Sequence, residues 1–172
     1  SITLTVNPEP VMSTSLNATV CSDAVSGITL ATNGTSVAAS SYTLNTVTVA
    51  GGLISVVETA PASGLAAGAI AGDIFRNTTN GPLTVIYNVT PVTPGCSGDA
   101  INITLTVNPE PVMSGSLNAA VCSDAVSGII LNTNGTSVPA GTFTLNTVTV
   151  AGGLISVVEA APGSGLAAGA IA

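Results

Sequence analysis

Stretches in which apolar and polar residues alternate recur along the whole chain. In Ile2–Val6 and again in Leu83–Thr90, every second side chain is apolar, with Thr or Asn in most of the positions between. A period of two is typical of a β-strand with one buried face. The alternation, and the turn residues between the runs, predict about seven strands in a domain of about 100 residues. They are expected near 13–20, 27–32, 42–49, 53–58, 73–78, 83–90 and 101–107.

Local breaks in this pattern predict turns and irregularities. Two β-rich runs flank Gly51-Gly52, which predicts a hairpin, because Gly accepts the positive φ of tight turns. Asn33-Gly34 and Asn80-Gly81 predict further turns. The alternation changes phase around Leu44–Val47, which predicts a β-bulge. Ala60–Ala71 consists largely of small residues, and we weigh a helical turn against a packed loop for it.

The chain contains a long internal repeat. Ile2–Ala71 matches Ile103–Ala172 at a constant offset of 101 residues, with 60 of 70 positions identical. Most differences exchange small or polar residues, and Tyr42 is replaced by Phe143. A repeat of this length is too long for a solenoid coil and has the size of a whole domain. We therefore expect tandem domains arranged as beads on a string.

The register of the repeat predicts domain boundaries. Two N-P-E-P segments, residues 7–10 and 108–111, are predicted linkers, stiff and extended because proline restricts itself and the residue before it. Residues 11–107 then form one complete domain. Residues 1–6 would be the last strand of a preceding repeat, and residues 112–172 an incomplete second repeat. The chain is then a window from a longer protein.

Composition excludes several classes of function. The chain has one cation, Arg76, against eight acidic residues, a net charge of −7 and no His. One positive charge cannot neutralise a run of phosphates, which argues against nucleic acids and anionic membrane surfaces as partners. Ala60–Ala71 is too short and too rich in Gly and Ala to span a bilayer, so no membrane insertion is expected. A polar surface of Thr, Ser and Asn indicates an extracellular surface or fibre protein.

Three cysteines set a further expectation. Cys21 and Cys122 occupy the same position of the repeat, and Cys96 precedes the last predicted strand. Within one domain we expect a Cys21–Cys96 disulfide, which would stabilise the fold by roughly 4 kcal/mol in the chain-entropy model. Cys122 would pair with a cysteine beyond the end of the chain. The alternative is buried free thiols, and metal binding is disfavoured because no CxxC motif or His accompanies the cysteines.

Candidate chemistry is sparse. No Ser or Thr has a His to activate it, and no spacing brings two carboxylates together, so the sequence predicts no catalytic residues, no enzyme activity and no cofactor. Asp23 and Asp99 each follow a cysteine closely, and a Cys21–Cys96 disulfide would place both acids near one end of the domain. They are weak calcium candidates. The plainer interpretation is that each caps a turn. Arg76 is expected to pair with Asp73 or another acid.

Four motifs together resemble a known family. They are V-C-S-D at Val20–Asp23, N-T-T-N-G-P-L-T-V-I-Y-N-V-T-P at Asn77–Pro91, G-C-S-G-D at Gly95–Asp99 and T-L-T-V-N-P-E-P at Thr104–Pro111. They resemble the PKD-like/Ig-like repeats of giant Bacteroidota cell-surface adhesins, which are type IX secretion substrates and include SprB-like gliding adhesins. The resemblance implies an immunoglobulin-like β-sandwich, secretion to the cell surface, a domain disulfide and a stalk-like role. It supplies no binding site.

Three hypotheses for function follow. The first is a structural repeat segment of a long secreted adhesin or extracellular filament, acting as a mechanical spacer in adhesion or gliding. Its partners would be neighbouring repeats, with lateral self-association into a fibre as a further option and an unknown distal ligand. The second is a carbohydrate- or cell-binding module, which the scarcity of aromatic residues disfavours. The third is a fibre subunit that polymerises by strand exchange, with residues 1–6 completing a neighbour's sheet.

Overall fold

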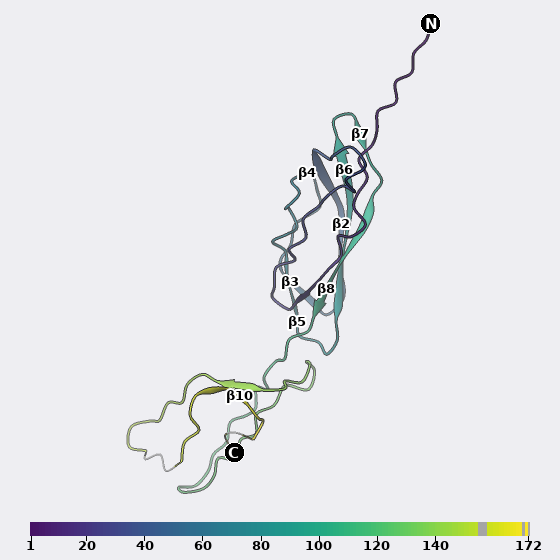
Figure 1. The fold of residues 1–172 in the computed structure, drawn as a ribbon. Coiled ribbons are helices and arrows are strands. Elements are labelled where there is room, and N and C mark those ends of the chain that lie inside the picture. Colours follow the sequence, from purple (N-terminus) through teal and green to yellow (C-terminus); the bar gives the residue numbers. More distant parts are fainter. Residues whose placement is uncertain (155–157, 170, 172) are drawn as a thin grey trace. The chain divides into compact units, whose positions relative to one another are not determined.

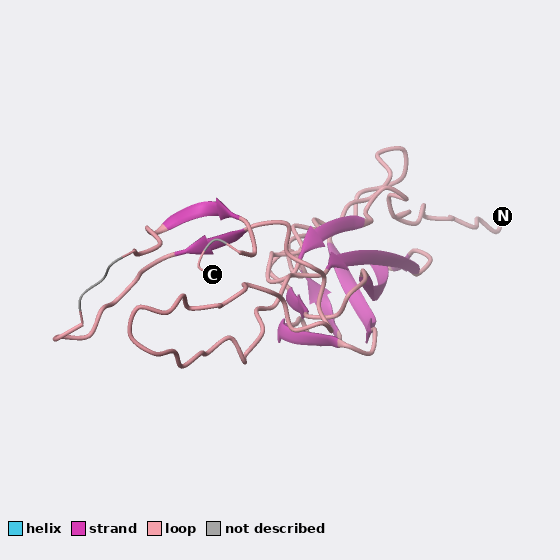
Figure 2. Ribbon diagram, turned by 90° about the horizontal axis from the view of Figure 1, so that it is seen from below, coloured by secondary structure: helices cyan, strands magenta, loops and turns pink. Residues whose placement is uncertain are grey.

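The computed structural model describes residues 1–154, 158–169 and 171. By internal contacts the chain divides into two compact units, Ser1–Glu110 (unit 1) and Pro111–Ala172 (unit 2). The described residues form strands, turns and loops, with no α-helix among them (Figure 2). The predicted all-β class is confirmed.

Unit 1 is a sandwich of one large and one small sheet (Figure 1). The large sheet has the order β1-β8-β6-β2-β4, with β7 paired to β6, and the small sheet joins β3 and β5. All neighbours are antiparallel except β1 and β8, which run parallel. The strands are β1 Ala18–Cys21, β2 Ser41–Val49, β3 Leu53–Val57, β4 Ala62–Leu65, β5 Ile74–Asn77, β6 Leu83–Thr93, β7 Cys96–Ser97 and β8 Ile101–Asn108.

The core lies between the two sheets and is built on β6 and β8. Both strands bury every second side chain, as their alternating sequences predicted. Tyr87 of β6 and Phe75 of β5 are the largest side chains among the fully buried residues. Around them pack Met12, Ile28, Leu30, Tyr42, Leu44, Ile70, Val85, Val89, Ile103, Leu105 and Val107. Burial of these side chains, each worth about 1.5–3 kcal/mol, is the main stabilising contribution.

Two sequence expectations for single elements fail. The strand predicted near 27–32 is absent, although Ile28 and Leu30 are buried. Its backbone makes isolated bonds to the chain around Ala67 instead of a ladder, such as Leu30 N–H to the Ala67 carbonyl at 2.8 Å. Ala60–Ala71 contains the unpredicted strand β4 followed by turns, so the helical alternative is wrong.

The Gly51-Gly52 turn does not close a hairpin. β2 pairs with β4 and β6, whereas β3 pairs with β5, so the turn carries the chain from one sheet to the other. Gly52 has a φ of +100°, which favours glycine. The predicted bulge is confirmed, since the β2–β6 register shifts between Leu44 and Thr46.

Unit 2 keeps the local pairings of its sequence repeat over fewer strands. β9 (Phe143–Leu145) and β10 (Gly163–Leu166) pair antiparallel, as β2 and β4 do in unit 1. The isolated bridge Met113–Thr133 reproduces Met12–Thr32. Residues 119–122, the counterparts of β1, form no strand. The repeated sequence therefore makes the same local contacts in both units, and the long ladders occur only where β6 and β8 are present.

Candidate functional site

The chain enters and leaves the sandwich of unit 1 at opposite ends. At the β7 end, Pro10 is fully buried and Gly98 packs against it; a Cβ on Gly98 would lie 1.8 Å from the Pro10 carbonyl oxygen. At the other end, β8 leads into the second N-P-E-P segment, where the Glu110 N–H donates to the Asn77 carbonyl at 3.0 Å. Figure 1 shows β7 and β5 at these two ends. Each linker is thus attached to the sandwich where it meets it.

Asn77 organises the end at which the chain leaves. Its side chain is fully buried and donates to the carbonyls of Gly81 at 3.0 Å and Val107 at 2.8 Å. Its Oδ1 accepts from the Thr79 N–H at 3.1 Å and the Thr79 hydroxyl at 2.7 Å. This amide joins β5, the turn after it and the end of β8, because a buried polar side chain must find partners for its donors and acceptors.

Arg76 sits at the same end and forms a three-residue charge cluster. Its Nε donates to both carboxylate oxygens of Asp23 at 3.1 Å, and Glu110 Oε1 lies 4.0 Å away. Its hydrogen bond and charge interaction with Asp23 raise the pKa of Arg76. The arginine therefore connects β5, the turn after β1 and the linker. At this exposure the ion pairs contribute little to stability, so the cluster mainly positions these segments.

Asp73 is a buried carboxylate inside the sandwich, and it is not the partner of Arg76. Its side chain accepts hydrogen bonds from the Thr59 N–H at 3.0 Å, the Thr59 hydroxyl at 2.7 Å and the Tyr87 hydroxyl at 3.0 Å. Burial is the main cause that raises the pKa of Asp73. Burial, and next the charge of Asp73, raise the pKa of Tyr87. With each oxygen engaged by the protein, this acid has a structural role.

The predicted Cys21–Cys96 disulfide is wrong. Cys21 pairs with Asn108 at one end of the large sheet, and Cys96 pairs with Thr93 at the other. Most of the length of β6 separates them, roughly 35 Å at about 3.3 Å per residue, whereas a disulfide needs Cα atoms within about 7 Å. Cys21, Cys96 and Cys122 are free thiols, with Cys21 and Cys122 exposed and Cys96 partly exposed.

The two weak calcium candidates are also not brought together. Asp23, with a φ of 62°, follows β1 and faces Arg76, whereas Asp99 is exposed in the loop between β7 and β8. The expectation that they share one end depended on the disulfide and fails with it. Among the residues that the structure describes, no three His, Cys, Asp or Glu side chains group in a way that could hold a metal ion.

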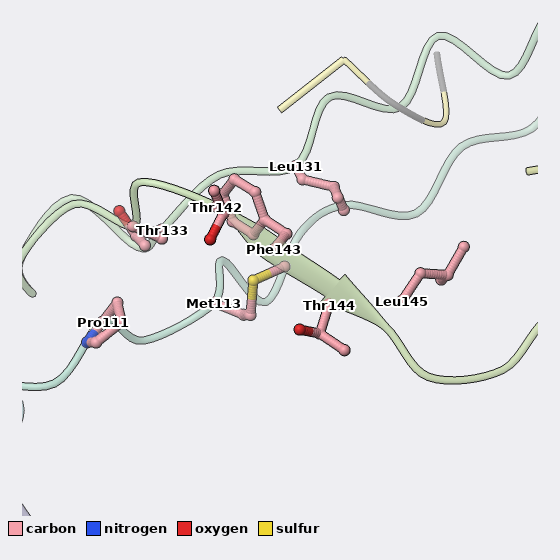
Figure 3. A pocket seen from close by; sticks show the side chains of 9 residues that line it. Pro111, Met113, Leu131, Thr133, Thr142, Phe143, Thr144 and Leu145 are labelled. Atoms are coloured by element: carbon pink, nitrogen blue, oxygen red, sulfur yellow. The ribbon is translucent and has the colours of Figure 1, made fainter. Parts of the chain in front are cut away.

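Unit 2 contains a cavity of about 270 Å³ (Figure 3). Its lining includes the apolar side chains of Pro111, Met113, Leu131, Phe143 and Leu145. Four of the counterparts in unit 1, Met12, Leu30, Tyr42 and Leu44, are buried in the sandwich core. The cavity therefore lies where the repeated sequence buries side chains under β6 and β8 in unit 1.

The fold and these motifs agree with a comparison to known families. The PKD-like domain matches residues 18–111, more than half of the chain. The chain belongs to the PKD-like domain family. The match runs from β1 through the Asn77 and Arg76 contacts to the start of the second Pro-Glu-Pro sequence. No curated protein and no solved structure matches the chain.

Membership in the family supports a coarse functional assignment. PKD-like domains are typically extracellular modules of structural or adhesion type, and they are generally not catalytic. No helix in the described part of the chain is long and apolar enough to cross a membrane. The residues that organise unit 1 are therefore those that hold its two ends and its core.

Sequence reasoning did not find these organising residues. Asp73 was noted only as one of few acids and as a partner for Arg76, and Asn77 only as part of a turn-rich motif. The available signal was the rarity of charge: an acid placed between Ile70 and Phe75 is flanked by apolar residues on both sides. Nothing in the sequence indicated that Gly98 approaches Pro10, since the two residues are distant along the chain.

Proposed function

We propose that this chain is a structural repeat segment of a long secreted cell-surface adhesin or extracellular filament, of the kind exported by type IX secretion. It acts as a mechanical spacer in adhesion or gliding. The observation that carries the proposal is the path of the chain through unit 1. The chain enters beside Gly98 at one end of the sandwich and leaves beside Asn77 at the other. Repeats connected in this way extend along the sheet instead of folding back.

The strand order supports a load-bearing role. β1 is near the start of the unit, β8 is at its end, and they lie side by side in parallel over Ala18–Cys21. A pull on the two linkers slides β1 along β8, so the ladder bonds are loaded together and not one after another. The Asn17 side chain adds a bond across the same seam, since its Oδ1 accepts from the Thr104 N–H at 2.8 Å.

Single-molecule stretching of the whole chain tests the proposal. We expect one distinct rupture from unit 1, with a gain in contour length of about 300 Å from roughly 3.5 Å per released residue. Asn17→Ala should lower the rupture force, because it removes the side-chain bond across the seam. The counterpart substitution Asn118→Ala in unit 2 is the matched control and should leave that rupture unchanged. If unit 1 extends at the low force of an unfolded chain, the spacer function is wrong.

A further inference from the structure

The N-terminal segment Ile2–Asn7 has the same sequence as Ile103–Asn108, which forms β8, in a different environment. The three apolar side chains of β8 that face the core are 0% exposed. Their counterparts Ile2, Leu4 and Val6 are 102%, 86% and 81% exposed. The segment therefore has the apolar face of a central strand and no sheet against it. An uncovered face of this kind is a ready partner for another sheet edge.

Unit 2 offers a matching edge. In unit 1, Ala18–Cys21 is a strand whose neighbour in the sheet is β8. The counterpart residues 119–122 differ at one position, Ala120 in place of Thr19, and form no strand. The same sequence is thus a strand beside β8 and irregular without it. Residues 119–122 have the propensity for a ladder and lack the second strand.

The apolar residues around that edge are also uncovered. Met12 is 2% exposed in unit 1, whereas its counterpart Met113 is 47% exposed in unit 2. Val121, the counterpart of the partly buried Val20, is 55% exposed. Met113 also lines the cavity shown in Figure 3. The position that β8 fills in unit 1 is therefore available to an apolar strand in unit 2.

We propose that Ile2–Asn7 of one copy of this chain adds as a parallel strand to residues 119–122 of a second copy, in the position that β8 has beside β1. The register follows from the β1–β8 pairing and the offset of the repeat. It pairs Leu4 with Ala119, Thr5 with Ala120, Val6 with Val121 and Asn7 with Cys122.

Two further hydrogen bonds of unit 1 have counterparts in this arrangement. In unit 1 the Thr104 N–H donates to Asn17 Oδ1 at 2.8 Å, and the Ser22 N–H donates to the Asn108 carbonyl at 2.9 Å. Between copies, the Thr3 N–H donates to Asn118 and the Ser123 N–H to the Asn7 carbonyl. Backbone bonds of this kind give strand addition its affinity, and the alternating side chains give it specificity.

The association joins one end of a chain to a different surface of the next chain. Such a heterologous contact leaves a free donor segment and a free acceptor edge on every pair, so it continues into a linear assembly. The inference deepens the proposed function by naming a second copy of this chain as a lateral partner. It concerns unit 2 and the N-terminal segment, so its failure leaves the stretching response of unit 1 untouched.

Light scattering coupled to size-exclusion chromatography of the whole chain is the first test. We expect the average mass to rise above 16.5 kDa with protein concentration. Leu4→Asp should weaken the association about tenfold or more, because it places a charge on the apolar face. Thr5→Asp adds the same charge to the opposite face of the strand and is the matched control. Because Leu4 is exposed, neither change disturbs the core of unit 1.

A cross-link tests the register directly. With oxidised glutathione as the oxidant, Asn7→Cys should form a disulfide with Cys122 of a second copy, because paired residues of neighbouring strands lie within disulfide reach. Cys21 should not react, because Asn108 already occupies that place. Glu9→Cys, two residues beyond the paired segment, is the control. A mass that stays at the monomer value at all concentrations, equal effects of Leu4→Asp and Thr5→Asp, or equal cross-linking from positions 7 and 9 would overturn the proposal.

Discussion

At the scale of single residues, Asp73 shows how a charge-poor protein accommodates a buried acid. The carboxylate receives three hydrogen bonds, yet burial still raises its pKa above the ordinary value of 3.8. Between these two pKa values the native state keeps a proton that the unfolded state has lost. The free energy of unfolding therefore falls as the pH rises through this range.

We predict that Asp73→Asn removes this part of the pH dependence. The measurement is denaturant unfolding of both proteins at a series of pH values from 3 to 7, followed by Tyr fluorescence. Asp99→Asn is the control, since it removes the same charge from an exposed loop and leaves the Thr59 and Tyr87 contacts in place. Parallel curves for wild type and Asp73→Asn would contradict the prediction.

The close approach of Gly98 to Pro10 gives a second prediction at this scale. A methyl group at Gly98 meets the Pro10 carbonyl oxygen at 1.8 Å, so the linker or the loop must move. We expect Gly98→Ala to destabilise unit 1 by about 1–3 kcal/mol, measured by thermal unfolding. Gly68→Ala is the control, because a Cβ there meets nothing within 4 Å. Equal melting temperatures for the two variants would show that Pro10 is not held at this site.

At the scale of elements, the crossing between the two sheets depends on Gly52. Its φ is +100°, and an added Cβ would lie 3.2 Å from side-chain carbons of Leu83 and Thr79. We predict that Gly52→Ala costs about 1–3 kcal/mol, through backbone strain and this contact. The adjacent Gly51→Ala, with open space and no positive φ, should change the melting temperature little. A similar loss from both variants would mean that the turn tolerates a side chain at either position.

The elements that the sequence predicted well are those with two paired neighbours. β6 and β8 alternate strictly because one face of each meets the core along its whole length, and the phase change in β2 correctly marked the bulge. The stretch near 27–32 has the same apolar spacing but bonds to an irregular partner, so spacing alone did not separate a buried loop from a strand. The Gly51-Gly52 hairpin failed because a turn motif does not determine which sheet receives the next strand.

At the scale of the whole molecule, the distance between Cys21 and Cys96 changes the expected stability. Because no disulfide joins the ends of unit 1, a reducing agent should leave its unfolding midpoint unchanged, and a Cys21→Ser, Cys96→Ser double variant should behave like wild type. Thiol titration of the unfolded, unreduced chain should find all three cysteines. A fall of several kcal/mol on reduction would contradict this prediction and indicate a cross-linked fold.

The candidate site was predicted only in outline. Composition and the internal repeat indicated an extracellular, all-β repeat protein, because those properties are spread over the whole sequence. The contacts that organise unit 1 could not be predicted, since each joins residues far apart in the chain, such as Gly98 with Pro10 or Arg76 with Asp23. Pairing Cys21 with Cys96 assumed that both lay at one end, and only the strand register decides that.

The single arginine has a consequence for how copies of the protein behave in solution. Arg76 is engaged by Asp23 and Glu110, so its charge is already compensated locally within a chain of net charge −7. Neighbouring molecules therefore face one another with a surface of one sign, and mutual repulsion keeps them dispersed in dilute buffer. Salt shortens the range of that repulsion, and acidification towards the isoelectric point near 4.1 removes it. Bundling of such filaments should thus respond to brine and acid more strongly than the fold itself does.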